Sequence, residues 1–225
     1  MQSDDVQVSV LGDDLVGVNL ADTRTSQALA DYLRATGDWL ECVAGIESCV
    51  ARFDLASVDV GTAQARLLAA LNEAPPAADL DESLVEIPVC YGGAHGPDLG
   101  DICEQLDLSR EEIIALHSGR EYRVDMLGFT PGFAFIGGLD DALNVPRRRE
   151  PRVRLEAGSI GIAGGRTGIY TLAGPGGWPV IGRTPMKLFD AHADEPFGLR
   201  AGMQVRFVPI EPTEFSRAES EWRSG

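Results

Sequence analysis

The distribution of glycine is the sequence feature that most constrains the fold. Five glycines lie before residue 83 and 21 lie after it. Glycine permits tight turns and close backbone approach but weakens helices, so the glycine-rich part favours short strands joined by turns. The composition changes within residues 75–83, which mix proline, alanine and acidic side chains. We therefore expect two domains, residues 1–82 and 83–225.

The first domain alternates strand and helix patterns. Residues 6–10 alternate apolar and polar side chains, which is the period of a strand, whereas residues 22–35 and 61–72 place apolar residues on one helical face. The expected elements, in order, are strands at 6–10 and 15–18, a helix at 22–35, strands at 39–44 and 48–53, and a helix at 61–72. This β-β-α-β-β-α order predicts a small α/β domain of the ferredoxin-like kind.

The second domain is expected to be rich in short strands. A strand at 84–89 and helical patterns at 98–106 and 109–117 come first, and helical periodicity then disappears. Short β-like runs follow between glycines and prolines, at 120–127, 133–136, 153–155, 159–163, 167–172, 178–181 and 203–210. Frequent short strands of this kind indicate a barrel or a sandwich. The polar stretch 212–225 is expected to fray.

Charge and cysteine usage argue against several classes of function. The chain carries 35 acidic and 19 basic side chains, a net charge of -16, which repels nucleic acid and anionic membranes. Four cysteines without a Cys-x-x-Cys pair, and only three histidines, argue against a zinc site. No apolar run approaches a membrane span and no signal-peptide pattern is seen, so we expect a cytoplasmic protein with reduced thiols.

Several segments carry side chains suited to binding or catalysis. His117, at the expected end of a helix, could transfer protons or interact with the helix dipole. Five arginines within 147–154 would bind a carboxylate or phosphate, or would pair with local acids. The aromatic residues of 128–135 could wall a pocket or plug the barrel. Arg183 and Thr184 would hold an anionic ligand, or the arginine would form an internal salt bridge.

The glycine-rich segment 158–168 is ambiguous. Its backbone N–H groups could cradle an anion, or its glycines could serve tight barrel turns. Its spacing matches neither a dinucleotide-binding fold nor a P-loop. The sequence also lacks a Gly-x-Ser-x-Gly elbow and a recognisable Cys-His signature. Any catalysis is therefore expected to need groups from elsewhere.

Ordered motifs over residues 85–210 resemble the PxpB family, the B subunits of 5-oxoprolinase, also described as the KipI or allophanate hydrolase subunit 1 family. The shared motifs lie at 87–93, 96–98, 117–118, 120–124, 128–133, 137–139, 146–148, 157–159, 161–164, 167–170, 175–178, 181–185 and 188–190. The resemblance implies an α+β protein, in which a small α/β domain precedes a cyclophilin-like β-barrel.

The resemblance also implies partners. Family members normally work with the C subunit, which has a related fold, and the 5-oxoprolinase assembly adds a hydrolytic A subunit. That assembly opens 5-oxo-L-proline to L-glutamate with hydrolysis of ATP, so ATP is the expected cofactor of the complex. We hypothesise that the B and C subunits help to activate the lactam by phosphorylating its oxygen and that the A subunit hydrolyses it.

The same resemblance leads to a set of site residues. Aromatic side chains would hold the ring, Arg147 or Arg183 its carboxylate, and His117 would carry a proton. The expected substrate-binding residues are Phe129, Phe133, Arg147, Arg166, Tyr170, Arg183 and Thr184. Several positions depart from the family pattern: Arg166 stands where glutamine is usual, Thr171 and Glu156 stand where proline is found, and Ala134, Phe135 and Ile136 replace the usual Pro-Tyr-Leu. A positive charge thus replaces an amide, and one phenolic hydroxyl is missing.

Two other functions agree with this resemblance. A protein related to allophanate hydrolase or urea carboxylase subunits would also handle a planar amide. A KipI-like inhibitor of a sensor histidine kinase would need only the acidic first domain or a barrel surface. Peptidyl-prolyl isomerase motifs are not apparent.

Overall fold

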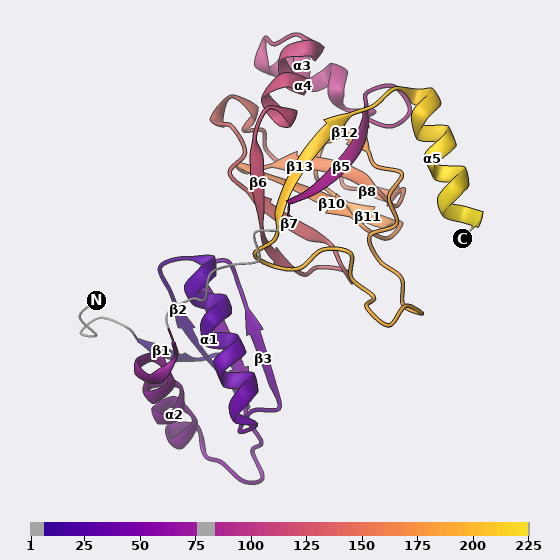
Figure 1. The fold of residues 1–225 in the computed structure, drawn as a ribbon. Helices are drawn as coiled ribbons and strands as arrows, with labels where there is room; N and C mark the ends of the chain where they lie inside the picture. Colours follow the sequence, from indigo (N-terminus) through magenta and orange to yellow (C-terminus); the bar gives the residue numbers. More distant parts are fainter. Residues whose placement is uncertain (1–6, 76–83, 225) are drawn as a thin grey trace. The chain divides into compact units, whose positions relative to one another are not determined.

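The computed structural model describes residues 7–75 and 84–224 (Figure 1). The chain separates into two compact units, Met1–Leu80 and Asp81–Gly225. The expected boundary between residues 82 and 83 lies outside the described residues, so that position stays a prediction.

The first unit has the expected order of elements. They are β1 (Val8–Val10), β2 (Leu15–Asn19), α1 (Thr23–Thr36), β3 (Glu41–Ala44), β4 (Ser48–Arg52) and α2 (Val60–Glu73). The strands form an antiparallel sheet in the order β1-β2-β4-β3. The assignment of this unit to the ferredoxin-like folds stays a prediction.

Local sequence signals explain where the helices of the first unit begin and end. The Asp22 carboxylate caps α1 by accepting the Thr25 N–H at 2.7 Å, and Gly37 ends that helix with φ 74°. Asp59 caps α2 in the same way, at 2.9 Å from the N–H of Thr62. The two helices and the sheet share one core, which includes Val16, Val18, Leu29, Leu33, Cys49, Phe53 and Leu67.

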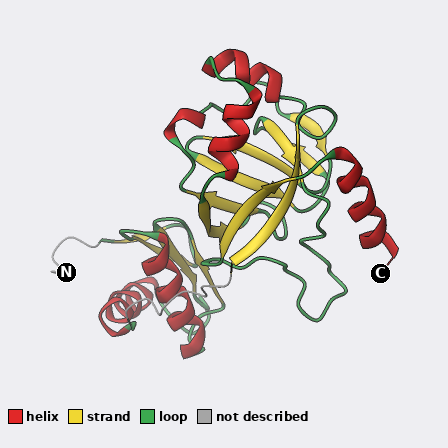
Figure 2. Ribbon diagram, turned by 45° about the horizontal axis from the view of Figure 1, so that its top comes forward, coloured by secondary structure: helices red, strands yellow, loops and turns green. Residues whose placement is uncertain are grey.

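The second unit contains the expected barrel. Its strands are β5 (Leu84–Tyr91), β6 (Glu121–Leu127), β7 (Ala134–Gly137), β9 (Ser159–Ala163), β10 (Arg166–Tyr170), β12 (Val180–Arg183) and β13 (Gln204–Pro209). These seven close into a barrel in the order β10-β7-β6-β13-β5-β12-β9 (Figure 2). Neighbours are antiparallel except β5 and β13, which are parallel. The mixed α+β class and the barrel are thus confirmed, whereas the cyclophilin-like assignment stays a prediction.

Shorter elements surround the barrel. They are α3 (Leu99–Leu106), α4 (Arg110–Ser118), a 3-10 turn (Asp141–Leu143), and β8 (Arg152–Leu155) paired with β11 (Gly174–Gly176). A capping box between Ser109 and Glu112 starts α4, as the sequence indicates. The barrel interior is apolar, with Ile87, Val89, Val124, Ile136, Ile160, Ile162, Ile169, Val205 and Phe207 in one cluster.

The expectation that residues 212–225 fray is wrong for Pro212–Ser224, which form helix α5, and residue 225 lies outside the described residues. One ring anchors the helix: Phe215 is only 2% exposed and lies 4.1 Å from His95 between ring centroids. The general polarity of the stretch conceals this anchor in the sequence. None of the described helices is long and apolar enough to cross a membrane.

Candidate functional site

Three of the expected site residues lie on the outer face of the barrel, over strands β7, β9 and β10: Phe133, Arg166 and Tyr170. Gly168 of β10 shows which face this is, because a Cβ there would lie 2.9 Å from the Phe133 ring and 3.1 Å from Trp178. Side chains alternate along a strand, so Arg166 and Tyr170 share the face of Gly168. Between them, Thr167 and Ile169 point into the barrel.

Four rings on this face form what we call the outer aromatic cluster: Phe133, Phe135, Tyr170 and Trp178. Phe133 lies at its centre, with ring centroids 4.7 Å from Phe135, 4.9 Å from Tyr170 and 5.8 Å from Trp178. All three contacts are edge to face, which is a favoured aromatic geometry. Phe133, Tyr170 and Trp178 are buried, but Phe135 is only half-buried. The cluster therefore keeps one ring partly open to a ligand.

The glycines of residues 158–168 make this packing possible. Gly161 pairs with Gly168 across β9 and β10, and the missing side chains leave a flat floor beneath the rings. Gly164 and Gly165, with φ 56° and 73°, form the two-residue turn that joins these strands. The N–H groups of Gly158 and Gly164 bond to the carbonyls of Tyr170 and Val145. The segment thus serves the turns and the close packing of the barrel.

Phe129 stands at the edge of the outer aromatic cluster, 5.6 Å from Phe133 between ring centroids. Its side chain is 65% exposed and its backbone has φ 66°, a conformation that is costly for a bulky residue. It borders a 440 Å³ hollow lined by Leu127, Gly128, Phe129, Thr130, Pro131, Gly132 and Phe197. This lining is apolar apart from backbone groups and the Thr130 hydroxyl.

The arginine cluster divides into half-buried and exposed members. Arg148 and Arg152 both donate to the carboxylate of Asp98. The hydrogen bond from Arg148 is 2.5 Å long, and the two from Arg152 are 2.6 and 2.8 Å long. The Asp98 side chain is 3% exposed and also accepts the Val180 N–H at 2.7 Å. Arg147 is exposed, and its charge opposes the effect of burial, which raises the pKa of the Tyr170 phenol. Arg147 is thus an expected site arginine that is close enough for its charge to act on Tyr170.

His117 lies inside the barrel unit rather than on its surface. Its Nδ1 is 2.7 Å from the Tyr91 hydroxyl, and its Nε2 is 2.9 Å from the Thr167 hydroxyl. The ring stacks on Phe207 at 4.3 Å between centroids, and burial lowers its pKa to about 3. These contacts favour a structural role, so the proton carrier stays a prediction without geometric support.

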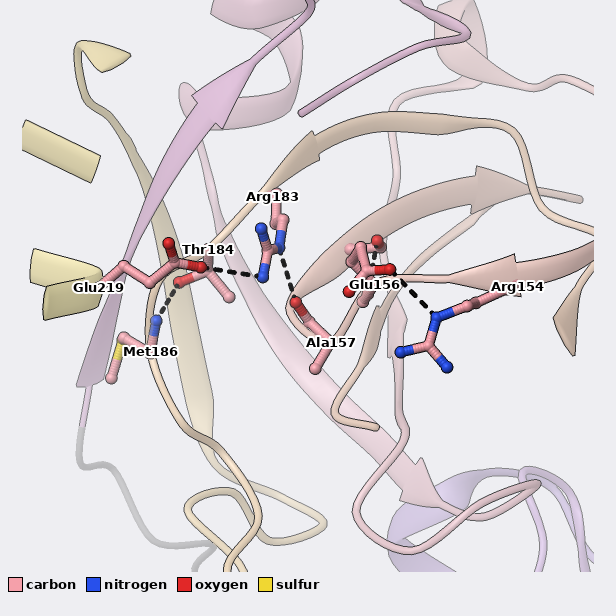
Figure 3. A network of polar contacts seen from close by, with 8 residues as sticks. Arg154, Glu156, Ala157, Arg183, Thr184, Met186 and Glu219 are labelled. Carbon is pink, nitrogen blue, oxygen red and sulfur yellow. Dashed lines mark hydrogen bonds and ion pairs between the residues drawn. The ribbon is translucent and has the colours of Figure 1, made fainter. Parts of the chain in front are cut away.

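Arg183 and Thr184 lie at the end of β12, in a separate polar network (Figure 3). Arg183 donates from Nε to the Ala157 carbonyl at 2.8 Å and from Nη2 to the Glu219 carboxylate at 3.1 Å (Figure 3). Its guanidinium also lies 5.3 Å above the Phe215 ring. The Thr184 hydroxyl accepts the Met186 N–H at 3.2 Å. Here the structure shows the internal salt bridge, which ties α5 to the barrel.

Arg166 has a partner that sequence reasoning missed. Its Nε lies 3.5 Å from Asp125 Oδ2, which is within ion-pair distance but too far for a good hydrogen bond. Asp125 is half-buried, and burial raises the pKa of its carboxyl while the Arg166 charge partly offsets this. The alternation of inward and outward side chains along β6 does not predict the direction of Asp125, because the pairing of the strand is irregular at this residue.

Within residues 7–75 and 84–224, no group of three or more His, Cys, Asp or Glu side chains could hold a metal ion. Cys42, Cys49, Cys90 and Cys103 are free thiols. Burial raises the pKa of Cys49 to about 12, so this thiol is inert at neutral pH.

Comparisons with known proteins agree with the sequence motifs. The carboxyltransferase domain family, subdomain C and D, matches residues 6–199. The chain belongs to this family. The B subunit of the 5-oxoprolinase of Escherichia coli O157:H7 is 50% identical over 137 residues, 61% of this chain and 63% of that protein. Its namesake from Bacillus subtilis strain 168 is 46% identical over 143 residues, 64% of this chain and 60% of that protein.

These relatives confirm the resemblance to the PxpB family. The chain spans 60 to 63% of the length of the two curated relatives. Among solved structures, TTHA0988 has a TM-score of 0.76 at 35% identity, covering 91% of this chain and 40% of that one. The Kluyveromyces lactis urea carboxylase has a TM-score of 0.77 at 18% identity, covering 94% of this chain and 22% of that one. The latter likeness concerns the fold alone.

Proposed function

We propose that the chain is the B subunit of an ATP-dependent 5-oxoprolinase, which acts with the A and C subunits to hydrolyse 5-oxo-L-proline to L-glutamate. The observation that carries the proposal is the 46 to 50% identity to three proteins named as 5-oxoprolinase B subunits. The carboxyltransferase family supports the same assignment at a coarser level.

The outer face of the barrel supports a part in binding the ring. The half-buried Phe135 offers an aromatic face, and the Arg166 guanidinium on the same face of the barrel offers N–H donors. A small cyclic amide has the matching features, a flat ring and a carbonyl acceptor. Arg147 would attract the carboxylate of 5-oxoproline, because its charge acts on the same cluster.

Proton transfer fits this chain less well. His117 and Tyr91 bind each other inside the barrel unit, where a substrate would have to displace buried contacts to reach them. We therefore assign ring binding to this chain and the acid-base steps to the partner proteins. ATP belongs to the proposal at the level of the complex, where phosphorylation of the lactam oxygen would create a leaving group and make attack by water feasible.

The test is ATP-dependent release of glutamate from 5-oxoproline. This chain would be co-purified with the A and C subunits from the same organism and compared with mixtures that lack each component. We expect glutamate only when all three proteins and ATP are present. A complete, stable assembly without turnover would contradict the proposal, and allophanate hydrolysis and kinase inhibition would then be measured.

A further inference from the structure

Asp125 is displaced from the regular pattern of its strand. The pairing of β6 with β7 shifts between Val124 and Met126, so Asp125 is the extra residue of a β-bulge. Bulges turn a side chain in a new direction and recur beside active sites. The carboxylate lies over Gly137, where a Cβ would be 2.5 Å from its Oδ2. Gly137 and Phe135 are two residues apart on β7, so the carboxylate shares the face of the Phe135 ring.

Arg166 reaches the same place from β10. It directly follows the Gly164-Gly165 turn and shares its face of the strand with Tyr170. Its Nε is buried and has no hydrogen-bond partner within the described part of the chain. Two other arginines of the second unit differ, because Arg120 and Arg183 both donate to carbonyls and carboxylates. Arg166 and Asp125 are therefore close together but not saturated by each other.

We propose that Asp125 and Arg166 form a two-point hydrogen-bonding edge for a cyclic amide. The side chain of Phe135 would contact one face of the amide ring. The Asp125 carboxylate would accept the ring N–H, and the Arg166 guanidinium would donate to the ring carbonyl. A lactam presents these two groups side by side, because its amide is held cis by the ring. The inference rests on the proposed function only in its choice of a lactam as the ligand.

The surroundings of the pair would strengthen such hydrogen bonds. Asp125 is half-buried, and this burial raises the pKa of its carboxyl. Hydrogen bonds to charged groups are stronger where water is partly excluded. The glycine at 137 leaves space for the carboxylate, and the half-buried Phe135 leaves its ring partly open.

The first test uses two matched probes on the full chain. 2-Pyrrolidinone has both the carbonyl and the N–H, whereas N-methyl-2-pyrrolidinone keeps the carbonyl and lacks the N–H. Each would be titrated into ¹⁵N-labelled protein while the Arg166 Nε–H signal is followed by NMR. We expect 2-pyrrolidinone to shift this signal and to bind about tenfold more tightly than the N-methyl compound. Equal binding, or no shift of the Arg166 signal, would overturn the proposal without requiring any variant.

The second test uses paired variants. Asp125→Ala should abolish the preference for the N–H compound, and Arg166→Met should weaken both compounds about tenfold. Glu86→Ala and Arg206→Met are the controls, because they break another partly exposed ion pair of the barrel. Unchanged binding in the Asp125 and Arg166 variants, with native NMR spectra, would overturn the assignment.

The two proposals fail in different ways. If lactams bind at Arg166 but the complete assembly does not hydrolyse 5-oxoproline, the proposed function is wrong and the binding edge stands. If the assembly hydrolyses 5-oxoproline equally well with Asp125→Ala and Arg166→Met, the binding edge is wrong and the function stands.

Discussion

The imidazole of His117 has two partners that suit its neutral form. The Tyr91 hydroxyl can donate to Nδ1, the Nε2–H can then donate to the Thr167 hydroxyl, and Thr167 donates onward to the Gly161 carbonyl at 3.2 Å. Every group in this series of hydrogen bonds is satisfied once, without a charge. Because the ring is also fully buried, its pKa falls to about 3.

We expect His117 to make the barrel sensitive to acid. The unfolded chain takes up a proton on this ring near pH ~6.5, whereas the folded chain does not until about pH 3. As the pH is lowered from about 6.5 towards 3, the free energy of unfolding should therefore fall by about 1.4 kcal/mol per pH unit. His117→Gln should be about 2 kcal/mol less stable at pH 7, because Tyr91 and Thr167 lose a partner, but should show a shallower pH slope. Urea unfolding followed through barrel amide signals at pH 7, 6 and 5 would measure this, and parallel slopes would contradict it.

Asp98 should be among the most sensitive charged positions. Asp98→Asn would leave Arg148 and Arg152 beside a neutral amide, and we expect a loss of about 3 kcal/mol in the free energy of unfolding. Glu156→Gln is the matched control, because its exposed partner Arg154 lies 3.2 Å away and such pairs contribute less than about 1 kcal/mol. If urea unfolding gives similar losses in the free energy of unfolding for the two variants, the buried carboxylate of Asp98 is no more important for stability than an exposed one.

The family resemblance predicted a set of seven substrate-binding residues, of which the structure places Phe133, Arg166 and Tyr170 on one face and Arg183 and Thr184 in a separate network. The resemblance did not predict Asp98 or Asp125 as partners. Asp98 lies 50 and 54 residues from its arginines, so no local pattern connects them. The burial of His117 likewise depends on strands that follow it in the chain.

Glycine has a packing role in the strands of the barrel. Gly168→Ala would place a Cβ 2.9 Å from the Phe133 ring and 3.0 Å from the Ala134 carbonyl. We expect a loss of about 2 kcal/mol in stability, because neither neighbour can move without disturbing the outer aromatic cluster. Gly174→Ala is the control, since no atom lies within 4 Å of its Cβ position. A lower melting temperature for the Gly174 variant than for the Gly168 variant would refute this account.

Most elements follow from local signals, and the exceptions have clear causes. The strands of the barrel have apolar residues at regular intervals, and α4 has a capping box. In contrast, β11 is formed by Gly174–Gly176, a sequence with no strand propensity that pairs because β8 lies beside it. Helix α5 is held by the buried ring of Phe215 and by the ion pair between Arg183 and Glu219, and periodicity detects neither contact.

At the scale of the whole molecule, each of the two units has its own main hydrophobic core within the described residues. One is built around α1 and α2, and the other fills the barrel. We expect Leu67→Ala to destabilise the first unit by about 3 kcal/mol, because Leu67 is fully buried there. Amide hydrogen exchange should speed up in α2 and β2 and remain unchanged in β5 and β13. Faster exchange in the barrel as well would show that the two units unfold together.

The parallel pairing of β5 and β13 has a consequence for biosynthesis. Leu84 pairs with Gln204 and Val89 with Pro209, so the seam that closes the barrel joins the first and the last of its strands. During translation the ribosome must release the whole of β13 before this seam can form, whereas the first unit can already have folded. Until then β5 presents an unpaired apolar edge. A nascent chain that stalls before residue 204 would thus be a natural client for chaperones.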